Sequence, residues 1–240
     1  MKRDFELNLP FFEYGPKAYM YGKKLLELCR HLDKLGNIYD VDIIIDPQTV
    51  DIRMIAENTS ERVKVFSQNL DTLPIGKGMG KNLAEALREA GAEGVMLNHA
   101  ECPLSLQEIA AAIRRAREAG LASMVCGDTF AQIREIASFA PDIIVAEPSE
   151  LIGTGTAVGK DYVDGCLKLV HAINPDIIVL PSAGISCGKD CYNIVKAGAA
   201  GSGSSSALAL AADPFKMAED MVSSVRRAWD ELHKYQKAII

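Results

Sequence analysis

The sequence predicts an α/β protein of the (β/α)8 barrel type, because three observations agree. Short segments rich in Val and Ile alternate with longer segments of helical periodicity along the whole chain. Eight such strand–helix units fit into the 240 residues, and barrels of this type commonly have about 250 residues. Several predicted strands are apolar at successive positions, as expected for parallel strands buried on both faces. No linker or low-complexity segment divides the chain, so we expect one domain covering residues 1–240.

The predicted strands are short and follow one another at regular intervals. We expect them at residues 5–9, 41–46, 62–68, 94–98, 121–126, 142–146 and 176–180, with the eighth starting near residue 200. The helix after the first strand carries Leu25, Leu28 and Leu32 on one face, and a long closing helix is expected over residues 214–235. An open doubly wound sheet normally shows Gly-x-Gly-x-x-Gly after its first strand. That motif is absent here, which favours the barrel.

Composition and charge exclude several classes of function. The chain has 26 Lys and Arg against 32 Asp and Glu, a net charge of −6, so it carries no electrostatic footprint for nucleic acid. No apolar stretch is long enough to span a membrane, and no uninterrupted apolar core follows the first residues as in a signal peptide. The six cysteines show no Cys-x-x-Cys pair. We therefore expect a cytoplasmic protein with reduced thiols and no metal or other cofactor.

The active site of such a barrel lies at the carboxyl ends of its strands. Polar residues follow each predicted strand: Asn8, Asp46, Gln68, Asn69, His99, Glu101, Asp128, Glu147, Ser182, Ser186 and residues 202–206. The Gly- and Ser-rich loops after the seventh and eighth strands are where barrels usually bind phosphate through backbone N–H groups. These positions together predict a site for a small anionic ligand.

Three segments resemble the triosephosphate isomerase family, particularly its short archaeal type. Residues 145–155, Val-Ala-Glu-Pro-Ser-Glu-Leu-Ile-Gly-Thr-Gly, resemble that family's catalytic-base strand and lid loop. Residues 97–101, Leu-Asn-His-Ala-Glu, resemble its fourth strand, and residues 182–186, Ser-Ala-Gly-Ile-Ser, its phosphate loop. The resemblance extends from about residue 5 to 229. It implies a TIM barrel, a small phosphorylated sugar as substrate, a place in glycolysis or gluconeogenesis, and a homo-oligomer, dimer or tetramer.

The resemblance also implies a role for each matching residue. Glu147 matches the general base, His99 the neutral electrophile and Glu101 the carboxylate beside the catalytic histidine. Asn8 matches the family's strand-one asparagine. The positions that hold phosphate in the family, largely through backbone N–H groups, are matched by Gly153, Ser186, Ser205 and Ser206. Pro148 and residues 156–158 match the hinges of a lid.

The first predicted strand departs from the family pattern. The family has Asn-aromatic-Lys there, whereas this chain has Asn8-Leu9-Pro10 and so lacks the catalytic lysine. Three interpretations follow: an aldose–ketose isomerase in which Lys17, Lys77 or Lys81 replaces that cation, a paralogous isomerase or epimerase of a longer ketose phosphate, and a barrel that only binds a sugar phosphate. The Glu147 and His99 matches argue against the third interpretation, and the missing lysine argues against the first.

Overall fold

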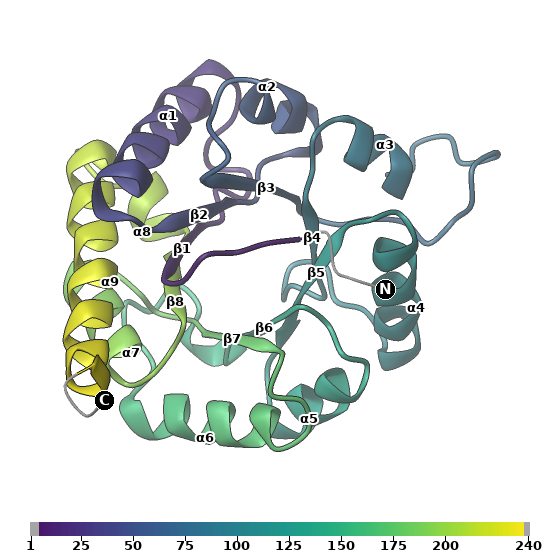
Figure 1. Ribbon diagram of the computed structural model, residues 1–240. Coiled ribbons are helices and arrows are strands. Elements are labelled where there is room, and N and C mark those ends of the chain that lie inside the picture. Colours follow the sequence, from purple (N-terminus) through teal and green to yellow (C-terminus); the bar gives the residue numbers. More distant parts are fainter. Residues whose placement is uncertain (1–4, 238–240) are drawn as a thin grey trace.

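The computed structural model describes residues 5–237, so both ends of the predicted domain, including residues 1–4 of the segment inspected for a signal peptide, lie outside it. Eight parallel strands form one sheet in the order β7-β6-β5-β4-β3-β2-β1-β8, and β7 contacts β8 to complete a ring inside the helices (Figure 1). The predicted (β/α)8 barrel is therefore confirmed. The strands are β1 Phe11–Tyr14, β2 Asp42–Ile45, β3 Val63–Ser67, β4 Gly94–Leu97, β5 Ala122–Gly127, β6 Ile143–Ala146, β7 Ile178–Pro181 and β8 Gly201–Ser204.

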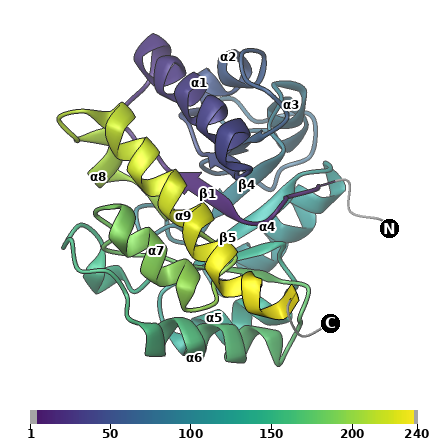
Figure 2. The same cartoon turned by 60° about the vertical axis from the view of Figure 1, so that its left-hand side comes forward.

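Nine α-helices lie within the described residues, and the longer ones cover the outside of the ring. They are α1 Gly22–Tyr39, α2 Ile52–Ala56, α3 Ala84–Glu89, α4 Leu106–Glu118, α5 Phe130–Ser138, α6 Lys160–His171, α7 Gly188–Lys196, α8 Ser206–Ala209 and α9 Pro214–Lys237. Helix α9 packs across α7 and α1 and so joins the last unit of the barrel to the first (Figure 2). None of the helices in residues 5–237 is both long and apolar enough to cross a bilayer.

The apolar core has two shells, because the strands are covered on both faces. The inner shell fills the barrel and includes Phe11, Ile44, Phe66, Met124 and Leu180. The outer shell lies between strands and helices and takes the opposite side chains of the same strands, such as Phe12 and Ile43, together with the buried faces of the helices. The strands are hydrophobic at successive positions because each one contributes to both shells.

The first predicted strand is wrong in its position. Residues 5–9 precede β1 and pair with no strand, while β1 pairs with β2 and β8 from Phe11 onward. Phe5 and Leu7 nevertheless pack on the inner core, and the Phe5 ring meets Phe66 edge-on at 5.6 Å. In Figure 1 this segment crosses the end of the barrel at which the strands begin. The alternation of apolar residues is therefore real, but it belongs to a plug rather than to a strand.

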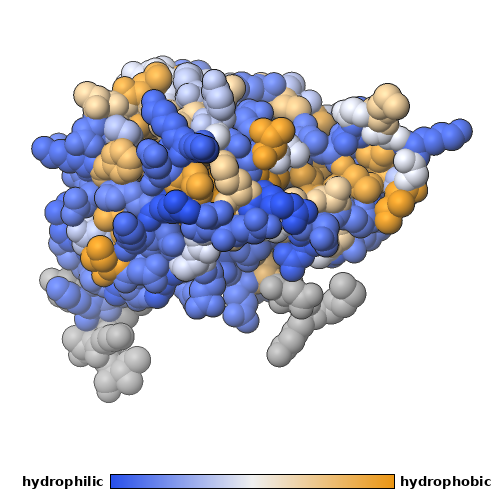
Figure 3. All heavy atoms as spheres, turned by 90° about the horizontal axis from the view of Figure 1, so that it is seen from above, coloured by the Kyte–Doolittle hydropathy of each residue, from blue (hydrophilic) through white to orange (hydrophobic). Residues whose placement is uncertain are grey.

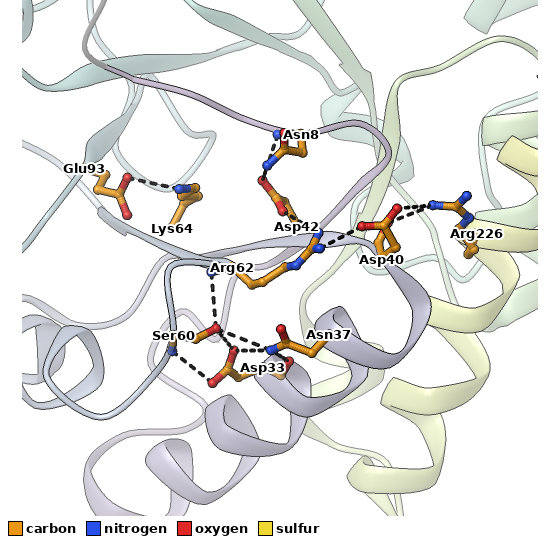
Figure 4. Close-up of polar contacts among 10 residues, drawn as sticks. All are labelled: Asn8, Asp33, Asn37, Asp40, Asp42, Ser60, Arg62, Lys64, Glu93 and Arg226. Atoms are coloured by element: carbon orange, nitrogen blue, oxygen red, sulfur yellow. Dashed lines mark hydrogen bonds and ion pairs between the residues drawn. The ribbon is translucent and has the colours of Figure 1, made fainter.

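A network of ion pairs and hydrogen bonds covers this same end of the barrel, which we call the bottom (Figure 4). Asp42, at the start of β2, accepts hydrogen bonds from the Asn8 backbone N–H at 2.7 Å and from the Asn8 side chain at 3.2 Å. Arg62 donates to Asp42 at 3.3 Å and to Asp40 at 2.7 Å, and Arg226 holds the other oxygen of Asp40 at 2.9 Å. Every charged group in this chain of contacts therefore has an opposite charge beside it.

Candidate active site

A cavity of about 800 Å³ opens at the carboxyl ends of the strands. Residues that follow seven of the strands line it, together with Cys126 from within β5, as the sequence predicts for a barrel. Seven of the predicted site residues meet there: Glu147, His99, Glu101, Gly153, Ser186, Ser205 and Ser206. The prediction that the eighth residue, Asn8, belongs to this site is wrong. Asn8 lies at the bottom of the barrel, where its backbone N–H donates a hydrogen bond to Asp42.

Glu147 and His99 face each other across one side of the cavity. Glu147 follows β6 and His99 follows β4, and the His99 Nε2 lies 3.9 Å from the Glu147 Oε2. Burial raises the pKa of the Glu147 carboxyl, and the neighbouring charges of Glu101 and Asp128 raise it further against the opposing effect of Lys17. Burial, followed by the charge of Lys17, lowers the pKa of His99. A carboxyl with a raised pKa thus lies beside an imidazole that is neutral at pH 7.

The turn after β4 fixes the orientation of His99. Asn98 has a φ of 57°, and its side chain donates to the Cys126 carbonyl at 2.8 Å and accepts the Leu104 N–H at 2.8 Å. The backbone N–H of Glu101 donates to His99 Nδ1 at 3.1 Å. Because Nδ1 accepts, the proton of the neutral ring is on Nε2, the atom that faces Glu147.

Lys17, one of the three lysines considered as replacements for the family's cation, brings a positive charge to the site. It lies three residues after β1, lines the cavity, and its ammonium group is 2.6 Å from the Glu101 Oε1. That hydrogen bond is the main cause that lowers the pKa of Glu101. Of the two other lysines considered, Lys81 pairs with Asp71 and Lys77 is exposed in the same loop, and neither lines the cavity.

Two glutamines, whose function the sequence did not indicate, hold the backbone of Lys17. Lys17 has a φ of 49°, and its carbonyl accepts the side-chain N–H groups of Gln48 and Gln68, each at 3.1 Å. Gln48 also donates to the Gln68 side chain at 3.0 Å. These amides join the loops after β1, β2 and β3, so the position of Lys17 depends on contacts between three different loops.

The loop after Glu147 has the composition and anchoring of a lid. It begins with the 3₁₀ turn Ser149–Leu151 and contains Gly153 and Gly155, which have φ values of 74° and 71°. Asp128 accepts the Ser149 N–H at 2.8 Å and its hydroxyl at 3.1 Å. At the far end of the loop the Thr156 carbonyl lies against Gly184, so closely that a Cβ on Gly184 would overlap it. Both ends of the loop are therefore held by the rim.

The whole arrangement has a match among known proteins. The model of the family described as triosephosphate isomerase matches residues 15–217, which is most of the chain. The chain belongs to the triosephosphate isomerase family. A triosephosphate isomerase of Sulfolobus acidocaldarius is 35% identical over 219 residues, which cover 90% of this chain and 94% of that protein. A triosephosphate isomerase of Methanobacterium bryantii is 36% identical over 85% of this chain and 91% of its own length. Both relatives are archaeal-type proteins, as the resemblance implied.

The match to the triosephosphate isomerase family begins just after β1. It begins at residue 15, after Asn8 and Pro10, and it includes Lys17. The matched range thus contains Lys17 but not the Asn8-Leu9-Pro10 segment. With the strand at Phe11–Tyr14, the next cationic residue at the rim is Lys17.

The two Gly- and Ser-rich loops that the sequence predicts to bind phosphate differ in the hydrogen bonds that their donors make. The N–H and the hydroxyl of Ser186 both donate to Asp190, at 2.9 and 2.8 Å. By contrast, the buried hydroxyl oxygens of Ser204 and Ser205 have no hydrogen-bond partner, and both residues line the cavity. The hydroxyls at the end of β8 are therefore free to bind an anion. The Ser186 N–H is available to an anion only in competition with Asp190.

A second pair of carboxyls lies deeper in the cavity of this triosephosphate isomerase family member. Glu13 comes from β1 and Asp46 follows β2, and they are 8% and 1% exposed. Burial raises the pKa of Asp46 to about 7, partly offset by its hydrogen bond to Glu13. Burial and the nearness of Asp46 raise the pKa of Glu13 as well. The sequence indicated Asp46 as a rim residue, but not Glu13, which stands inside an otherwise aromatic strand.

No group of three or more His, Cys, Asp or Glu side chains among residues 5–237 has the arrangement of a metal site.

Proposed function

We propose that the protein is an aldose–ketose isomerase that acts on a small phosphorylated sugar by proton transfer through an enediolate. The observation that carries this proposal is the group formed by Glu147, His99 and Lys17 in one cavity, with the His99 Nε2 3.9 Å from Glu147. Membership of the triosephosphate isomerase family supports the same reaction class.

Glu147 acts as the base in this proposal. Its carboxylate takes the proton from the hydroxyl-bearing carbon next to the carbonyl, the electron pair moves to the carbonyl oxygen, and an enediolate forms. The proton of the original hydroxyl then passes to the former carbonyl oxygen while the carboxylic acid returns its proton to the neighbouring carbon, so a new carbonyl forms and no other reactant is consumed. Its raised pKa makes the carboxylate a stronger base than an exposed glutamate.

His99 and Lys17 stabilise the negative charge that develops on the two oxygens. The Nε2–H of neutral His99 donates to them, an assignment established for triosephosphate isomerase itself. The ammonium group of Lys17, held by Glu101, adds a fixed positive charge that attracts the phosphate ester and polarises the carbonyl. Glu101 therefore acts as a positioning residue for both Lys17 and His99.

The lid and the Gly/Ser loops complete the proposed mechanism. Gly153, Ser186, Ser205 and Ser206 line the part of the cavity where the phosphate would lie. A closed lid would exclude water, which matters because an exposed enediolate phosphate eliminates its phosphate group. Pro148 and residues 156–158 flank that loop and would move with it.

The test is Glu147→Gln, which keeps the shape of the side chain and removes the base. We expect the exchange of substrate hydrogen with solvent deuterium, followed by NMR with triose and tetrose phosphates, to fall by about 10²- to 10⁴-fold. Glu150→Gln is the matched control, because Glu150 is an exposed carboxylate in the same lid. Since Glu147 must be ionised, kcat/KM should rise with pH through a pKa above 4.5. Equal exchange rates in both variants would contradict the proposal.

The interpretation of a non-catalytic sugar-phosphate binder loses its main support. It rested on the absence of a cation, and Lys17 lines the cavity. The interpretation of a longer ketose phosphate as substrate gains support from the Glu13–Asp46 pair, which adds hydrogen-bonding groups below Glu147 and His99.

A homo-oligomer, dimer or tetramer, belongs to the same proposal. Residues 68–83, between β3 and α3, project from the barrel in Figure 1 and expose Ile75 and Met79. Figure 3 shows the side of the molecule with α1, α2 and α3, where apolar patches lie among charged side chains. Light scattering after size-exclusion chromatography should give a molar mass at least twice the 26.0 kDa of one chain.

We also propose a cytoplasmic location, supported by six free cysteines, and a place in glycolysis or gluconeogenesis, supported by the family.

A further inference from the structure

The Glu13–Asp46 pair forms the floor of the cavity. Glu13 points to the inside of the barrel from β1, and its carboxyl lies near that of Asp46, which follows β2, since both approach Gly15. Two glycines shape this floor: a Cβ at Gly203 would overlap the Glu13 Oε2, and one at Gly15 would lie 2.9 Å from the Glu13 Oε1. Because neither glycine has a side chain, the Glu13 carboxyl fits between β1 and β8.

The floor has buried polar groups without partners. Among residues 5–237, no N–H or O–H group donates a hydrogen bond to either carboxylate oxygen of Asp46. The neighbouring Glu13 carboxyl is the one group of the described residues that influences the pKa of Asp46 through a hydrogen bond. The hydroxyl oxygens of Ser204 and Ser205, which also line the cavity, have no partner either. A buried polar group left without a partner costs about 1–3 kcal/mol. Such groups beside a cavity indicate that a polar ligand fills the space above them.

The charge state of the pair limits which ligand fits. Two desolvated carboxyls that both approach Gly15 favour a state in which the pair keeps one proton, which agrees with the raised pKa values of Glu13 and Asp46. Glu147 acts on Glu13 in the same direction and Lys17 in the opposite one. A pair with one proton offers one O–H donor and one carboxylate acceptor. A hydroxyl group matches both, because it donates and accepts, whereas an ammonium group only donates.

We propose that Glu13 and Asp46 form a subsite for a substrate hydroxyl, which selects a phosphorylated hydroxy-ketose of four or more carbons over a triose phosphate. This inference rests on the proposed function, since Glu147 and His99 are taken to hold the two reacting carbons. A triose phosphate has only the two oxygens on those carbons and its phosphate ester. A hydroxyl at the floor must therefore belong to an additional carbon.

A divalent cation fits the floor less well than a hydroxyl. No third His, Cys, Asp or Glu of the described residues completes a metal-binding group with Glu13 and Asp46. The ammonium group of Lys17 is also close enough to influence Glu13. A hydroxyl adds no charge to this arrangement and can both donate to the carboxylate of the pair and accept from its one O–H group.

The test is the binding of a matched set of ligands to the Glu147→Gln variant, measured by calorimetry so that no turnover is needed. The ligands are erythrulose 4-phosphate, its 3-deoxy analogue, its 3-amino-3-deoxy analogue and dihydroxyacetone phosphate. We expect erythrulose 4-phosphate to bind roughly ten- to a hundredfold more tightly than the 3-deoxy analogue, because the latter leaves the buried acid unpaired. Adding Asp46→Ala should reduce that ratio to about one.

A second variant guards against a general loss of folding. Gly203→Ala keeps both acids but displaces the Glu13 carboxyl, so it too should lower the ratio. Asp176→Ala, an exposed carboxylate before β7, is the control and should leave the ratio unchanged. Four outcomes would each overturn the subsite. They are equal binding of the hydroxy and deoxy ligands, tighter binding of the amino analogue than of erythrulose 4-phosphate, no binding of any ligand, and an equal loss of affinity for all ligands in Asp46→Ala. A preserved ratio without hydrogen exchange in the unmodified protein would overturn the isomerase and leave the subsite standing.

Discussion

Asp42 and Asp46 stand at opposite ends of β2, are each 1% exposed, and have opposite surroundings. Asp42 accepts three hydrogen bonds, two from Asn8 and one from Arg62 (Figure 4). Asp46 accepts none from an N–H or O–H group outside its contact with Glu13, among the residues described. The same residue type at the same burial is thus part of a completed network at the bottom and of an incomplete one at the rim. The difference indicates that the bottom stabilises the fold, whereas the rim is arranged for a ligand.

The largest effect should come from the cation of the rim. Lys17→Met removes the ammonium group that faces the cavity, and we expect kcat/KM to fall by about 10²- to 10³-fold, as for the loss of one preorganised donor. The midpoint of urea unfolding should hardly change, because the partner Glu101 is 64% exposed. Steady-state kinetics measure the effect, with Lys77→Met as the exposed control. If Lys77→Met lowers kcat/KM as much, the assignment of Lys17 is wrong.

The reverse pattern is expected at the bottom. Asp42→Ala leaves Arg62 without one of its two carboxylate partners and removes the acceptor of both Asn8 bonds. We expect the free energy of unfolding to fall by about 2–3 kcal/mol, with kcat/KM unchanged within a factor of two. Urea denaturation and steady-state kinetics on the same sample make the comparison. Loss of activity without loss of stability would contradict the division between the two ends.

The Asp46 acid should make stability depend on pH in a direction that is unusual for a carboxylate. Its pKa is raised to about 7, so between about pH 4 and 7 the folded protein keeps a proton that the unfolded chain has lost. The stabilising contribution is complete below the unfolded pKa and is lost as pH rises through about 7, with a slope of at most about 1.4 kcal/mol per pH unit. Urea unfolding at intervals from pH 4.5 to 8 should show this decline. Asp46→Asn should make the decline shallower, although the buried Glu13 still contributes, and Asp176→Asn should leave it unchanged.

The smallest effect should come from Asn8, which the sequence assigned to the substrate. Asn8→Ala removes the 3.2 Å side-chain bond to Asp42 and keeps the 2.7 Å backbone bond. We expect a loss of about 0.5–1 kcal/mol in stability and no change in KM. A rise in KM of tenfold or more would restore Asn8 to the active site.

The error in the first strand shows where the sequence is ambiguous. Residues 5–9 alternate apolar and polar side chains, as a strand does, because Phe5 and Leu7 pack on the inner core while Glu6 and Asn8 are exposed. Residues 11–14 have no such alternation, because β1 is covered on both faces. Periodicity therefore favoured the wrong segment. That error placed the expected lysine at Pro10, whereas Lys17 is the lysine that lines the cavity.

The rest of the rim was predictable because its residues follow strands whose positions were correct. Glu147, His99 and Glu101 each come directly after a strand that the Val- and Ile-rich segments located within two residues. Gln48 and Gln68 acquire their role only when three loops meet at the Lys17 carbonyl. The partnership of Glu13 with Asp46 likewise depends on two neighbouring strands and on glycines in β8 and after β1.

The sequence by itself determined the barrel, its repeating units and the residues that end most of its strands, because hydrophobic periodicity and strand ends are local properties of the chain. Only the tertiary structure decided which of two apolar segments enters the sheet, which lysine reaches the cavity, and which buried acids lack partners. Those outcomes depend on strand register and on contacts between residues far apart in the chain, such as Asn8 with Asp42 and Lys17 with Glu101. A one-residue change in register turns a side chain to the other face of the sheet, and no local pattern fixes that choice.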